Sequence, residues 1–311
     1  MKVLISDEFQ EEGVEIFQKN GFEVFEKFTI TKEELKNEIG NYDAIVVRSR
    51  TKLTADVLEN AKNLKVIGRA GVGLDNIDLK KAAELNIDVL NTPEAPSVSV
   101  AELALGFMLT LARKISDADR TTHQGKWNKS QYLGYTLKGK KLGLLGFGNI
   151  AKELAKDAIA LGMKVGVYSR FSKGQVAIDE AKSIGCSIYP SVEDLLKDAQ
   201  IISLHLPSTS HTENLLNEER MKLMRKDAII INTARGSLID EKALIKALKN
   251  KDIGGAALDV YREEPLKDTE LINCEDNLVL TPHIASQTIE NQVDAATMIA
   301  EKISDFLKKF K

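Results

Sequence analysis

The sequence predicts an α/β protein built from two doubly wound domains, each with a parallel sheet covered by helices. Short β-rich runs alternate with longer helical stretches rich in Lys and Glu, which is the pattern of such sheets. The predicted strands are almost continuous in apolar residues, as expected when both faces of a sheet are buried. With 311 residues, the chain is long enough for two domains that each bury a core.

The predicted strands fall into two series. The first series comprises residues 2–6, 22–25, 43–47, 64–68 and 87–90. The second comprises residues 141–146, 164–168, 186–189, 200–204, 228–232, 255–260 and 278–282. Neither series contains an internal repeat or a low-complexity tract, so each is interpreted as one folded domain.

Two helical segments carry information about packing. Residues 98–112, VSVAELALGFMLTLA, are apolar on nearly every face of a helix, which predicts burial all round, either between domains or in a subunit contact. We expect this helix to form a homodimer, the commonest symmetric assembly, and the alternative is a helix enclosed by its own chain. The last segment forms one apolar stripe and should dock on a sheet face; its members are Ile289, Val293, Ala296, Ile299, Ile303, Phe306 and Phe310.

Composition excludes several classes of protein. Apolar residues make up 43% and charged residues 29%, which is typical of a folded globular chain, and a net charge of −3 argues against a general nucleic-acid binder. No apolar run reaches membrane-spanning length, and the first strand starts too early for a signal peptide. Cys186 and Cys274 have no metal-site spacing and suggest a reducing interior. We therefore expect a cytoplasmic protein with no metal, nucleic-acid or membrane partner.

The strongest local motif is GFGNIA, which follows the predicted strand at 141–145. Gly146 permits a tight turn, Gly148 lets the backbone approach a pyrophosphate, and Ala151 keeps the following helix close to the sheet. The amides of Asn149 and Ile150 would open that helix and hold the anion. Because the motif lies between a strand and a helix, it predicts dinucleotide binding rather than a simple tight turn.

The four histidines differ in their surroundings. His123 and His211 lie in polar stretches, where a solvated side chain is expected. His205 and His283 each follow an apolar strand, so both could reach a ligand beyond the carboxyl ends of the strands. Both could also be strand-end histidines that bind backbone carbonyls, and the residues alone do not separate these alternatives.

Several blocks of sequence resemble a known family. NTARGSLID (232–240), ALDVYREEPL (257–266) and TPHIA (281–285) are similar to signature blocks of the D-isomer-specific 2-hydroxyacid dehydrogenases. GRAGVGLDNID (68–78), residues 91–113 and HQGKW (123–127) resemble the D-3-phosphoglycerate dehydrogenase branch in particular. The resemblance covers the whole chain. Longer members of this branch carry a regulatory domain after the final helix, and a chain that stops at Lys311 is expected to be a short form.

The resemblance implies a catalytic set of three residues. Arg235 would hold the substrate carboxylate and polarise its oxygen, since a guanidinium fits a carboxylate with two bonds. His283 would be the acid/base and Glu264 would orient it, because oxidation of a hydroxy acid requires loss of the hydroxyl proton. The alternative is that Arg235 and Glu264 form surface ion pairs, as we expect for the neighbouring Arg262 and Glu263.

The resemblance also assigns binding residues. The cofactor would contact the glycine turn, with the remaining contacts from His205, Leu206, Pro207, Thr233, Ala234, Asp259, His283, Ala285 and Ser286. Asp259 would accept from the nicotinamide carboxamide. The backbone amides of Val72 and Gly73 would receive the substrate carboxylate. The substrate phosphate would be bound by Arg48, Ser49 and Arg69, whereas Arg50 and Lys52 are expected to form a solvated rim.

The position after the second strand of the nucleotide domain bears on cofactor choice. NAD-preferring relatives carry an aspartate there, which binds the ribose hydroxyls and repels a 2′-phosphate. This chain has Ser169 there, followed by Arg170, whose guanidinium suits a phosphate, and Lys173 could add to it. We expect NAD to be used, with NADP also accepted.

The resemblance implies the activity of a D-3-phosphoglycerate dehydrogenase, which would supply the first step of serine biosynthesis. A flavodoxin-like substrate domain (1–94 and 287–311) and a Rossmann nucleotide-binding domain (95–286) are expected, with the active site in the cleft between them. The enzymatic alternative is a glyoxylate or hydroxypyruvate reductase. The non-enzymatic alternative is a corepressor-like protein that senses a nucleotide.

Overall fold

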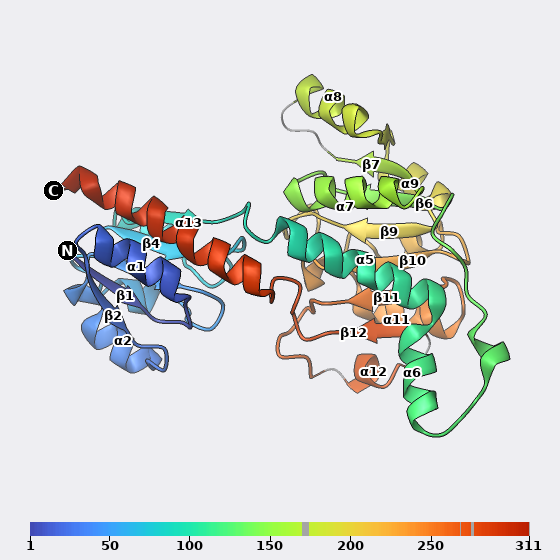
Figure 1. The fold of residues 1–311 in the computed structure, drawn as a ribbon, viewed down its shortest axis with the longest axis horizontal. Helices are drawn as coiled ribbons and strands as arrows, with labels where there is room; N and C mark the ends of the chain where they lie inside the picture. Colours follow the sequence, from blue (N-terminus) through green and yellow to red (C-terminus); the bar gives the residue numbers. More distant parts are fainter. Residues whose placement is uncertain (170–173, 268, 275–276, 311) are drawn as a thin grey trace. The chain divides into compact units, whose positions relative to one another are not determined.

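The computed structural model describes residues 1–169, 174–267, 269–274 and 277–310. The chain forms two compact units, one made of Met1–Pro96 with Ser286–Lys311 and the other of Ser97–Ala285 (Figure 1). Each unit is an α/β layer structure around one parallel sheet, which confirms the predicted fold class. None of the helices in the described part of the chain combines the length and apolar character needed to cross a bilayer.

The sheet of the first unit has five described strands, all parallel, in the order β2-β1-β3-β4-β5. This is the strand order of flavodoxin-type sheets. The strands are β1 (Lys2–Ile5), β2 (Glu23–Glu26), β3 (Ala44–Val47), β4 (Val66–Arg69) and β5 (Asp88–Asn91). Every predicted strand of the first series is present, displaced by at most two residues at either end.

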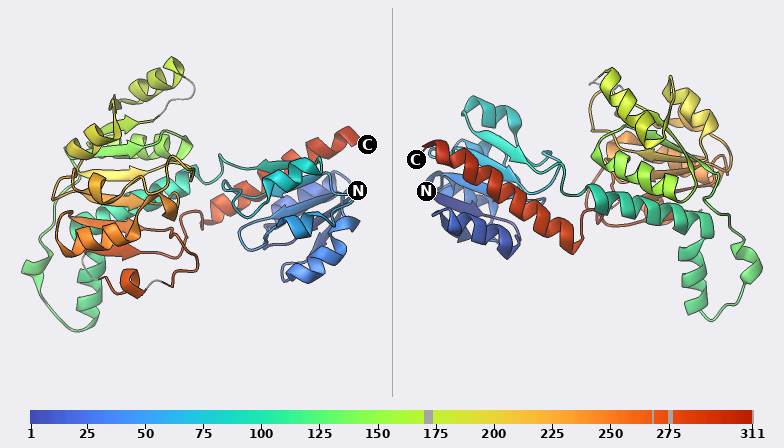
Figure 2. Two further views of the ribbon diagram at one scale, coloured as in Figure 1. Left: turned by 180° about the vertical axis from the view of Figure 1, so that it is seen from behind. Right: turned by 45° about the horizontal axis from the view of Figure 1, so that its top comes forward.

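Helices cover both faces of this first sheet. They are α1 (Glu11–Lys19), α2 (Lys32–Glu38), α3 (Ala55–Leu58), α4 (Leu79–Glu84) and α13 (Ile289–Leu307), with 3-10 turns η1 (Ile39–Asn41) and η4 (Lys308–Phe310). Side chains of β3 alternate between the faces, since Ala44 and Val46 join the core under α1 and α13 while Ile45 and Val47 join the opposite core. Helix α13 lies alongside α1 (Figure 2).

Helix α13 docks on β4, as the apolar stripe of the last segment predicts. For two residues of that stripe the predicted burial was wrong. Ile299 and Ile303 pack where β4 carries Gly68, at which an added Cβ would lie 2.3 Å from Ile303 Cδ1. Ile289 is 82% exposed because it is the first helical residue, and Phe310 is 51% exposed because it lies in η4, where the rotation per residue changes. Leu307 is buried instead.

The second unit contains a seven-stranded sheet in the order β12-β11-β10-β9-β6-β7-β8, again parallel throughout its described strands. Counted from β6, this is the Rossmann order with one further strand. Its strands are β6 (Lys141–Leu145), β7 (Lys164–Tyr168), β8 (Ser187–Ile188), β9 (Ile201–Leu204), β10 (Ile229–Asn232), β11 (Gly255–Leu258) and β12 (Leu278–Leu280).

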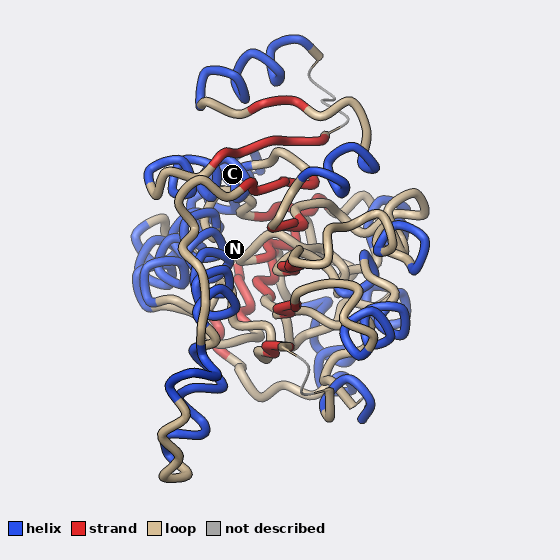
Figure 3. Tube along the Cα trace, turned by 90° about the vertical axis from the view of Figure 1, so that its right-hand side faces the viewer, coloured by secondary structure: helices blue, strands red, loops and turns tan. Residues whose placement is uncertain are grey.

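Helices again pack on both sides of the second sheet, and Figure 3 shows strands flanked by helices. One face carries α5 (Ser97–Arg113), α7 (Asn149–Ala160) and α8 (Gln175–Ile184); the other carries α9 (Val192–Asp198), α10 (Glu218–Met221) and α11 (Glu241–Lys249). The remaining elements are α6 (Ile115–His123), η2 (Lys129–Tyr132), η3 (Gly236–Leu238) and α12 (Thr269–Ile272).

Helix α5 is buried on one side by its own unit and exposed on the other. Its residues Ala101, Ala104 and Met108 are fully buried against the second unit, where α5 contacts α7 and the strands β10 and β11. On its other side Val98 is 58% exposed and Leu109 41% exposed. The second unit therefore covers one face of the helix, and cover of the other face by a subunit contact stays a prediction.

Candidate active site

The imidazole of His283 and the carboxylate of Glu264 form a hydrogen-bonded pair. His283 Nδ1 lies 2.7 Å from Glu264 Oε2, and the other carboxylate oxygen accepts from the Tyr261 amide at 3.1 Å. Nε2 of His283 has no partner among the described residues, and the side chain is 48% exposed. This is the arrangement of an acid/base whose second ring nitrogen is available to a substrate.

Asp259, which follows β11 and is fully buried, accepts hydrogen bonds from the turn that contains His283. Asp259 accepts from Thr281 Oγ1 at 2.5 Å and from the amides of Ile284 and Ala285, each at 2.8 Å. These bonds stabilise the left-handed backbone of His283, whose φ is 55°. Asp259 thus already uses both carboxylate oxygens within the protein, and the carboxamide contact stays a prediction.

Arg235 lies at the end of the neighbouring strand β10, in a turn built by Asn232. The Asn232 side chain is fully buried, donates to the Arg235 carbonyl at 2.9 Å and accepts from the Ala234 amide at 3.1 Å. The next residue, Gly236, packs against the backbone that leads to Glu264, since an added Cβ would lie 1.9 Å from the Tyr261 carbonyl carbon. Because β10, β11 and β12 are adjacent and parallel, all three proposed catalytic residues follow the same edge of the sheet.

The glycine turn has the geometry that the motif predicts. Gly146 has a φ of 101°, and an added Cβ would lie 2.3 Å from the His205 carbonyl oxygen, so only glycine fits there. An added Cβ at Gly148 would meet nothing within 4 Å, which leaves space at the start of α7. The first-turn amides of Asn149 and Ile150 have no acceptor within the helix and suit an anion.

Several residues assigned to the rest of the cofactor follow the strands β7, β9 and β10 of the same sheet. The Gly146 amide donates to the carbonyl of Tyr168, the residue before the partly buried Ser169. Leu206 and Pro207 follow β9, and Thr233 follows β10. The Thr233 hydroxyl is buried without a hydrogen-bond partner among the described residues, as expected of a group that binds a ligand. These features fit a bound dinucleotide.

Two residues named for the 2′-phosphate are not described, and two further cofactor residues lie on either side of the boundary between the units in the sequence. Arg170 and Lys173 are outside the described residues, so the 2′-phosphate prediction depends on sequence alone. Ser286 belongs to the first unit, where its carbonyl accepts from the Asn291 side chain at 2.6 Å. Ala285 is buried at the end of the second unit.

His205 differs from His283 in its partner. Its Nε2 lies 2.8 Å from Ser203 Oγ rather than beside a carboxylate or a backbone carbonyl. Burial lowers the pKa of His205 to about 4. The ring is therefore neutral at physiological pH, and the role of His283 as the acid/base stays a prediction. His123 and His211 are exposed, as the sequence predicts.

The low pKa of His205 predicts a loss of stability in acid. In the unfolded chain an ordinary histidine pKa of about 6.5 applies, so the unfolded state binds the extra proton as the pH falls from about 6.5 toward 4. Between pH 7 and pH 5 the free energy of unfolding should fall by about 2 kcal/mol more in the wild type than in His205→Asn. Urea unfolding of both proteins at both pH values measures this, and equal losses would contradict it.

The first unit gathers the residues assigned to the substrate anion at the carboxyl edge of its sheet. Arg48 and Ser49 follow β3, and Arg69 ends the adjacent strand β4. Arg69 Nη2 donates to Ser49 Oγ at 3.4 Å. The amides of Val72 and Gly73 donate to no acceptor in the described part of the chain, which leaves them available to a ligand.

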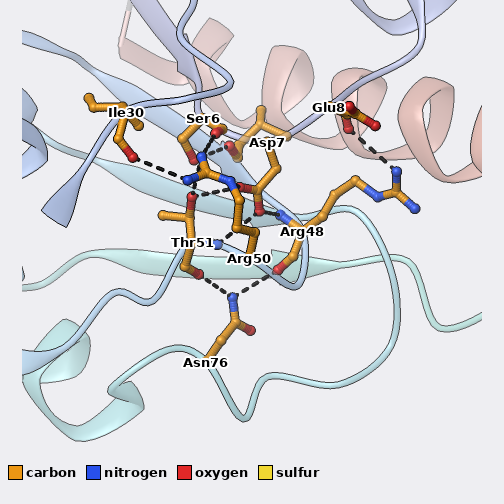
Figure 4. A network of polar contacts seen from close by, with 9 residues as sticks. Ser6, Asp7, Glu8, Ile30, Arg48, Arg50, Thr51 and Asn76 are labelled. Atoms are coloured by element: carbon orange, nitrogen blue, oxygen red, sulfur yellow. Dashed lines mark hydrogen bonds and ion pairs between the residues drawn. The ribbon is translucent and has the colours of Figure 1, made fainter. Parts of the chain in front are cut away.

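The same edge carries Arg50, which was expected in a solvated rim. Its side chain is 51% exposed, and it also forms an ion pair with the buried carboxylate of Asp7 at 3.2 Å and donates to the carbonyls of Ser6 and Ile30 (Figure 4). Sequence reasoning missed Asp7, although a polar residue directly after a buried strand is a recognisable signal. It also missed Asn76 and Asn232. Arg262 does form the expected ion pair, with Glu213 at 3.2 Å.

Comparison with known proteins finds a family model of 2-hydroxyacid dehydrogenases and relatives that are dehydrogenases or reductases. Residues 105–285 match the model of the D-isomer specific 2-hydroxyacid dehydrogenase, NAD binding domain family. The chain is 44% identical over 308 residues to a D-3-phosphoglycerate dehydrogenase of Methanocaldococcus jannaschii, covering 99% of this chain and 58% of that protein. It is 43% identical over 307 residues to a hydroxypyruvate reductase of Thermotoga maritima, covering 97% of each.

A solved structure of an acyclic imino acid reductase, Bsp5, in complex with NADPH and D-Arg matches with a TM-score of 0.87 and 30% identity. The match covers 99% of this chain and 98% of that one. The chain spans just over half the length of the first curated relatives it matches, at 54% to 58% of each.

Proposed function

The chain belongs to the D-isomer-specific 2-hydroxyacid dehydrogenases, and on that premise we propose that it is a D-3-phosphoglycerate dehydrogenase. It would exchange a hydride between C2 of 3-phosphoglycerate and a nicotinamide cofactor, the first step of serine biosynthesis. The observation that carries the chemistry is the 2.7 Å pair of His283 and Glu264 on the edge that also carries Arg235. A cytoplasmic location stays a prediction from composition.

The geometry supports the roles that the family resemblance implies for the chain's own residues. Arg235 holds the substrate carboxylate and draws electron density from the oxygen on C2. In the oxidative direction, Nε2 of His283 accepts the proton of the C2 hydroxyl, and the Glu264 carboxylate stabilises the protonated ring. The bound nicotinamide supplies the acceptor for the hydride that leaves C2. In the reductive direction, His283 returns the proton to the new hydroxyl oxygen.

Substrate choice separates this proposal from its alternatives. We expect kcat/KM with NADH, followed at 340 nm, to be highest for 3-phosphohydroxypyruvate and lower for hydroxypyruvate, glyoxylate and pyruvate. A higher value for hydroxypyruvate or glyoxylate would favour a reductase, the second candidate, which the 43% identity to a hydroxypyruvate reductase supports. Absence of turnover on all four acids would favour the nucleotide-sensing alternative.

We propose that NAD is the working cofactor and that NADP is also accepted. Ser169 carries no charge to repel a 2′-phosphate, so Ser169→Asp should restore that repulsion and lower kcat/KM for NADP at least tenfold while that for NAD changes little. Measuring kcat/KM with each cofactor for both proteins tests this. A wild type that rejects NADP, with no further change in the variant, would contradict it.

We also propose a homodimer formed through the exposed face of α5. The apolar side chains of Val98 and Leu109 on that face favour a partner over water. Sedimentation at micromolar concentration should give a mass near twice the 34.3 kDa of one chain. Leu109→Lys should shift the protein toward monomer, whereas Val176→Lys, at an exposed position on α8, should not. A wild-type monomer would refute the dimer.

A further inference from the structure

The carboxyl edge of the first sheet contains a buried carboxylate that the catalytic scheme does not use. Asp7 follows β1, and its side chain is only 4% exposed. It accepts from the Arg48 amide at 2.6 Å, the Thr51 amide at 3.2 Å and Thr51 Oγ1 at 2.6 Å, besides its ion pair with Arg50. The carboxylate thus binds both ends of the segment Arg48–Thr51, hereafter the anion loop.

A second side chain holds the same loop from the opposite side. Asn76 Nδ2 donates to the carbonyl of Arg48 at 2.8 Å and to the carbonyl of Thr51 at 2.7 Å. The backbone groups at both ends of the anion loop are therefore satisfied by two side chains, Asp7 on the amides and Asn76 on the carbonyls (Figure 4). Neither side chain belongs to the loop itself, so the loop conformation is imposed by the surrounding sheet.

The two arginines of the anion loop differ in their contacts with this network: Arg50 binds to it and the Arg48 guanidinium does not. Arg50 is held against Asp7 and the carbonyls of Ser6 and Ile30. Within the described residues, the guanidinium of Arg48 makes a single long hydrogen bond, 3.4 Å to the Glu8 carbonyl, and Figure 4 shows it directed away from the Asp7 cluster. Most N–H donors of the Arg48 guanidinium are therefore available to a bound anion.

The location of the network supports a role in binding. In the order β2-β1-β3-β4-β5, the chain reverses direction across the sheet between β1 and β3, and ligands bind beyond the carboxyl ends at such a switch point. Asp7 follows β1, the anion loop follows β3, and Arg69 ends β4, so the three lie on consecutive strands. A buried network placed there fixes the shape of a binding edge.

We propose that Asp7 and Asn76 are positioning residues for recognition of the substrate phosphate. They hold the anion loop so that Arg48 and Ser49 stand beside Arg69, and they keep Arg50 out of that group by binding it elsewhere. The inference rests on the proposed function for the identity of the anion. It predicts that loosening the loop weakens phosphate recognition while leaving the chemistry at His283 intact.

The test compares two substrates that differ by one phosphate, 3-phosphohydroxypyruvate and hydroxypyruvate. Asn76→Ala should raise KM for the phosphorylated acid at least tenfold, with kcat and the KM for hydroxypyruvate changing less than about threefold. Thr51→Val, which removes one donor to Asp7 and keeps its volume, should act in the same direction but less. Asp7→Asn should raise the KM for the phosphorylated acid most. If this variant does not fold, the comparison of Asn76→Ala and Thr51→Val with the wild type tests the inference.

The matched control is Asn63→Ala. Asn63 Nδ2 also donates to a backbone carbonyl, that of Gly40 at 2.7 Å, in the same unit but away from the anion loop. This variant should leave the ratio of the two KM values unchanged. Equal changes for both substrates in Asn76→Ala, or the same selective change in Asn63→Ala, would overturn the inference.

Failure of the proposed function gives a different result. If the wild type has the same kcat/KM for both acids, the phosphorylated substrate is wrong, and the inference is then decided without turnover by titrating inorganic phosphate calorimetrically. Binding to the wild type and Asn63→Ala that is weakened at least tenfold in Asn76→Ala supports it. Equal binding by all three proteins, or by none, overturns it.

Discussion

His283→Ala should lower kcat by about 100- to 10,000-fold, the range that a positioned acid/base contributes, while the affinity for NAD changes little. The reason is that the ring acts on the substrate proton through Nε2, whereas its Nδ1 is taken by Glu264 at 2.7 Å. Steady-state kinetics with 3-phosphohydroxypyruvate and a fluorescence titration with NADH measure the two quantities. The matched control is His205→Ala, since His205 is the other strand-end histidine and binds Ser203. A dead His205→Ala with an active His283→Ala would show that the acid/base is assigned wrongly.

Glu264→Gln isolates the contribution of the partner. A glutamine side chain keeps a hydrogen bond to the ring but lacks the charge that favours its protonated form. We therefore expect a smaller loss of kcat than in His283→Ala, measured with 3-phosphohydroxypyruvate and NADH. A kcat equal to that of the wild type would mean that Glu264 only packs against the ring.

Loss of either Arg48 or Arg69 should raise KM for 3-phosphohydroxypyruvate about 10- to 100-fold. Each hydrogen bond from a guanidinium to an anion contributes roughly 1.5–3 kcal/mol, and hydroxypyruvate has no phosphate to receive it. Arg48→Gln and Arg69→Gln should therefore change the KM for hydroxypyruvate much less. The comparison needs only the two substrates and one cofactor.

Lys52→Gln is the control for general electrostatics. Lys52 lies next to the anion loop and is exposed, with no hydrogen bond or ion pair among the described residues. Removing its charge should alter the KM for the phosphorylated acid less than threefold, and that small change should vanish at high salt because exposed charges are screened. If all three variants behave alike, the arginines act only through net charge.

The strands were predictable from the sequence because each buried strand is short, apolar and followed by polar residues. Burial around helices was less predictable, since hydrophobicity does not tell whether an apolar face meets its own chain or another. Leu109 illustrates this, as it is apolar yet 41% exposed. The predicted burial of Ile289 and Phe310 was wrong for a local reason, because Ile289 is the first residue of α13 and Phe310 lies in the 3-10 turn η4 after it.

The catalytic pair needed more than local pattern. His205 and His283 both follow apolar strands, and they differ in their hydrogen-bond partners. The partner of His205 is Ser203, 2 residues away in the sequence, whereas the partner of His283 is Glu264, 19 residues away. Only the family resemblance assigned Glu264 to His283. The Asp7 network escaped prediction because its contacts span about 40 residues between separate strands.

The docking of α13 on β4 has a consequence for synthesis of the protein. Residues 289–307 cover a sheet whose strands all precede residue 92, so the whole second unit lies between them in the chain. During translation, the part of β4 on which Ile299 and Ile303 pack lacks this cover until residues 289–307 have been synthesised. The second unit is continuous and is complete earlier. The core of the first unit is therefore completed only after the second unit has been translated, and apolar surface exposed in the meantime is prone to aggregation.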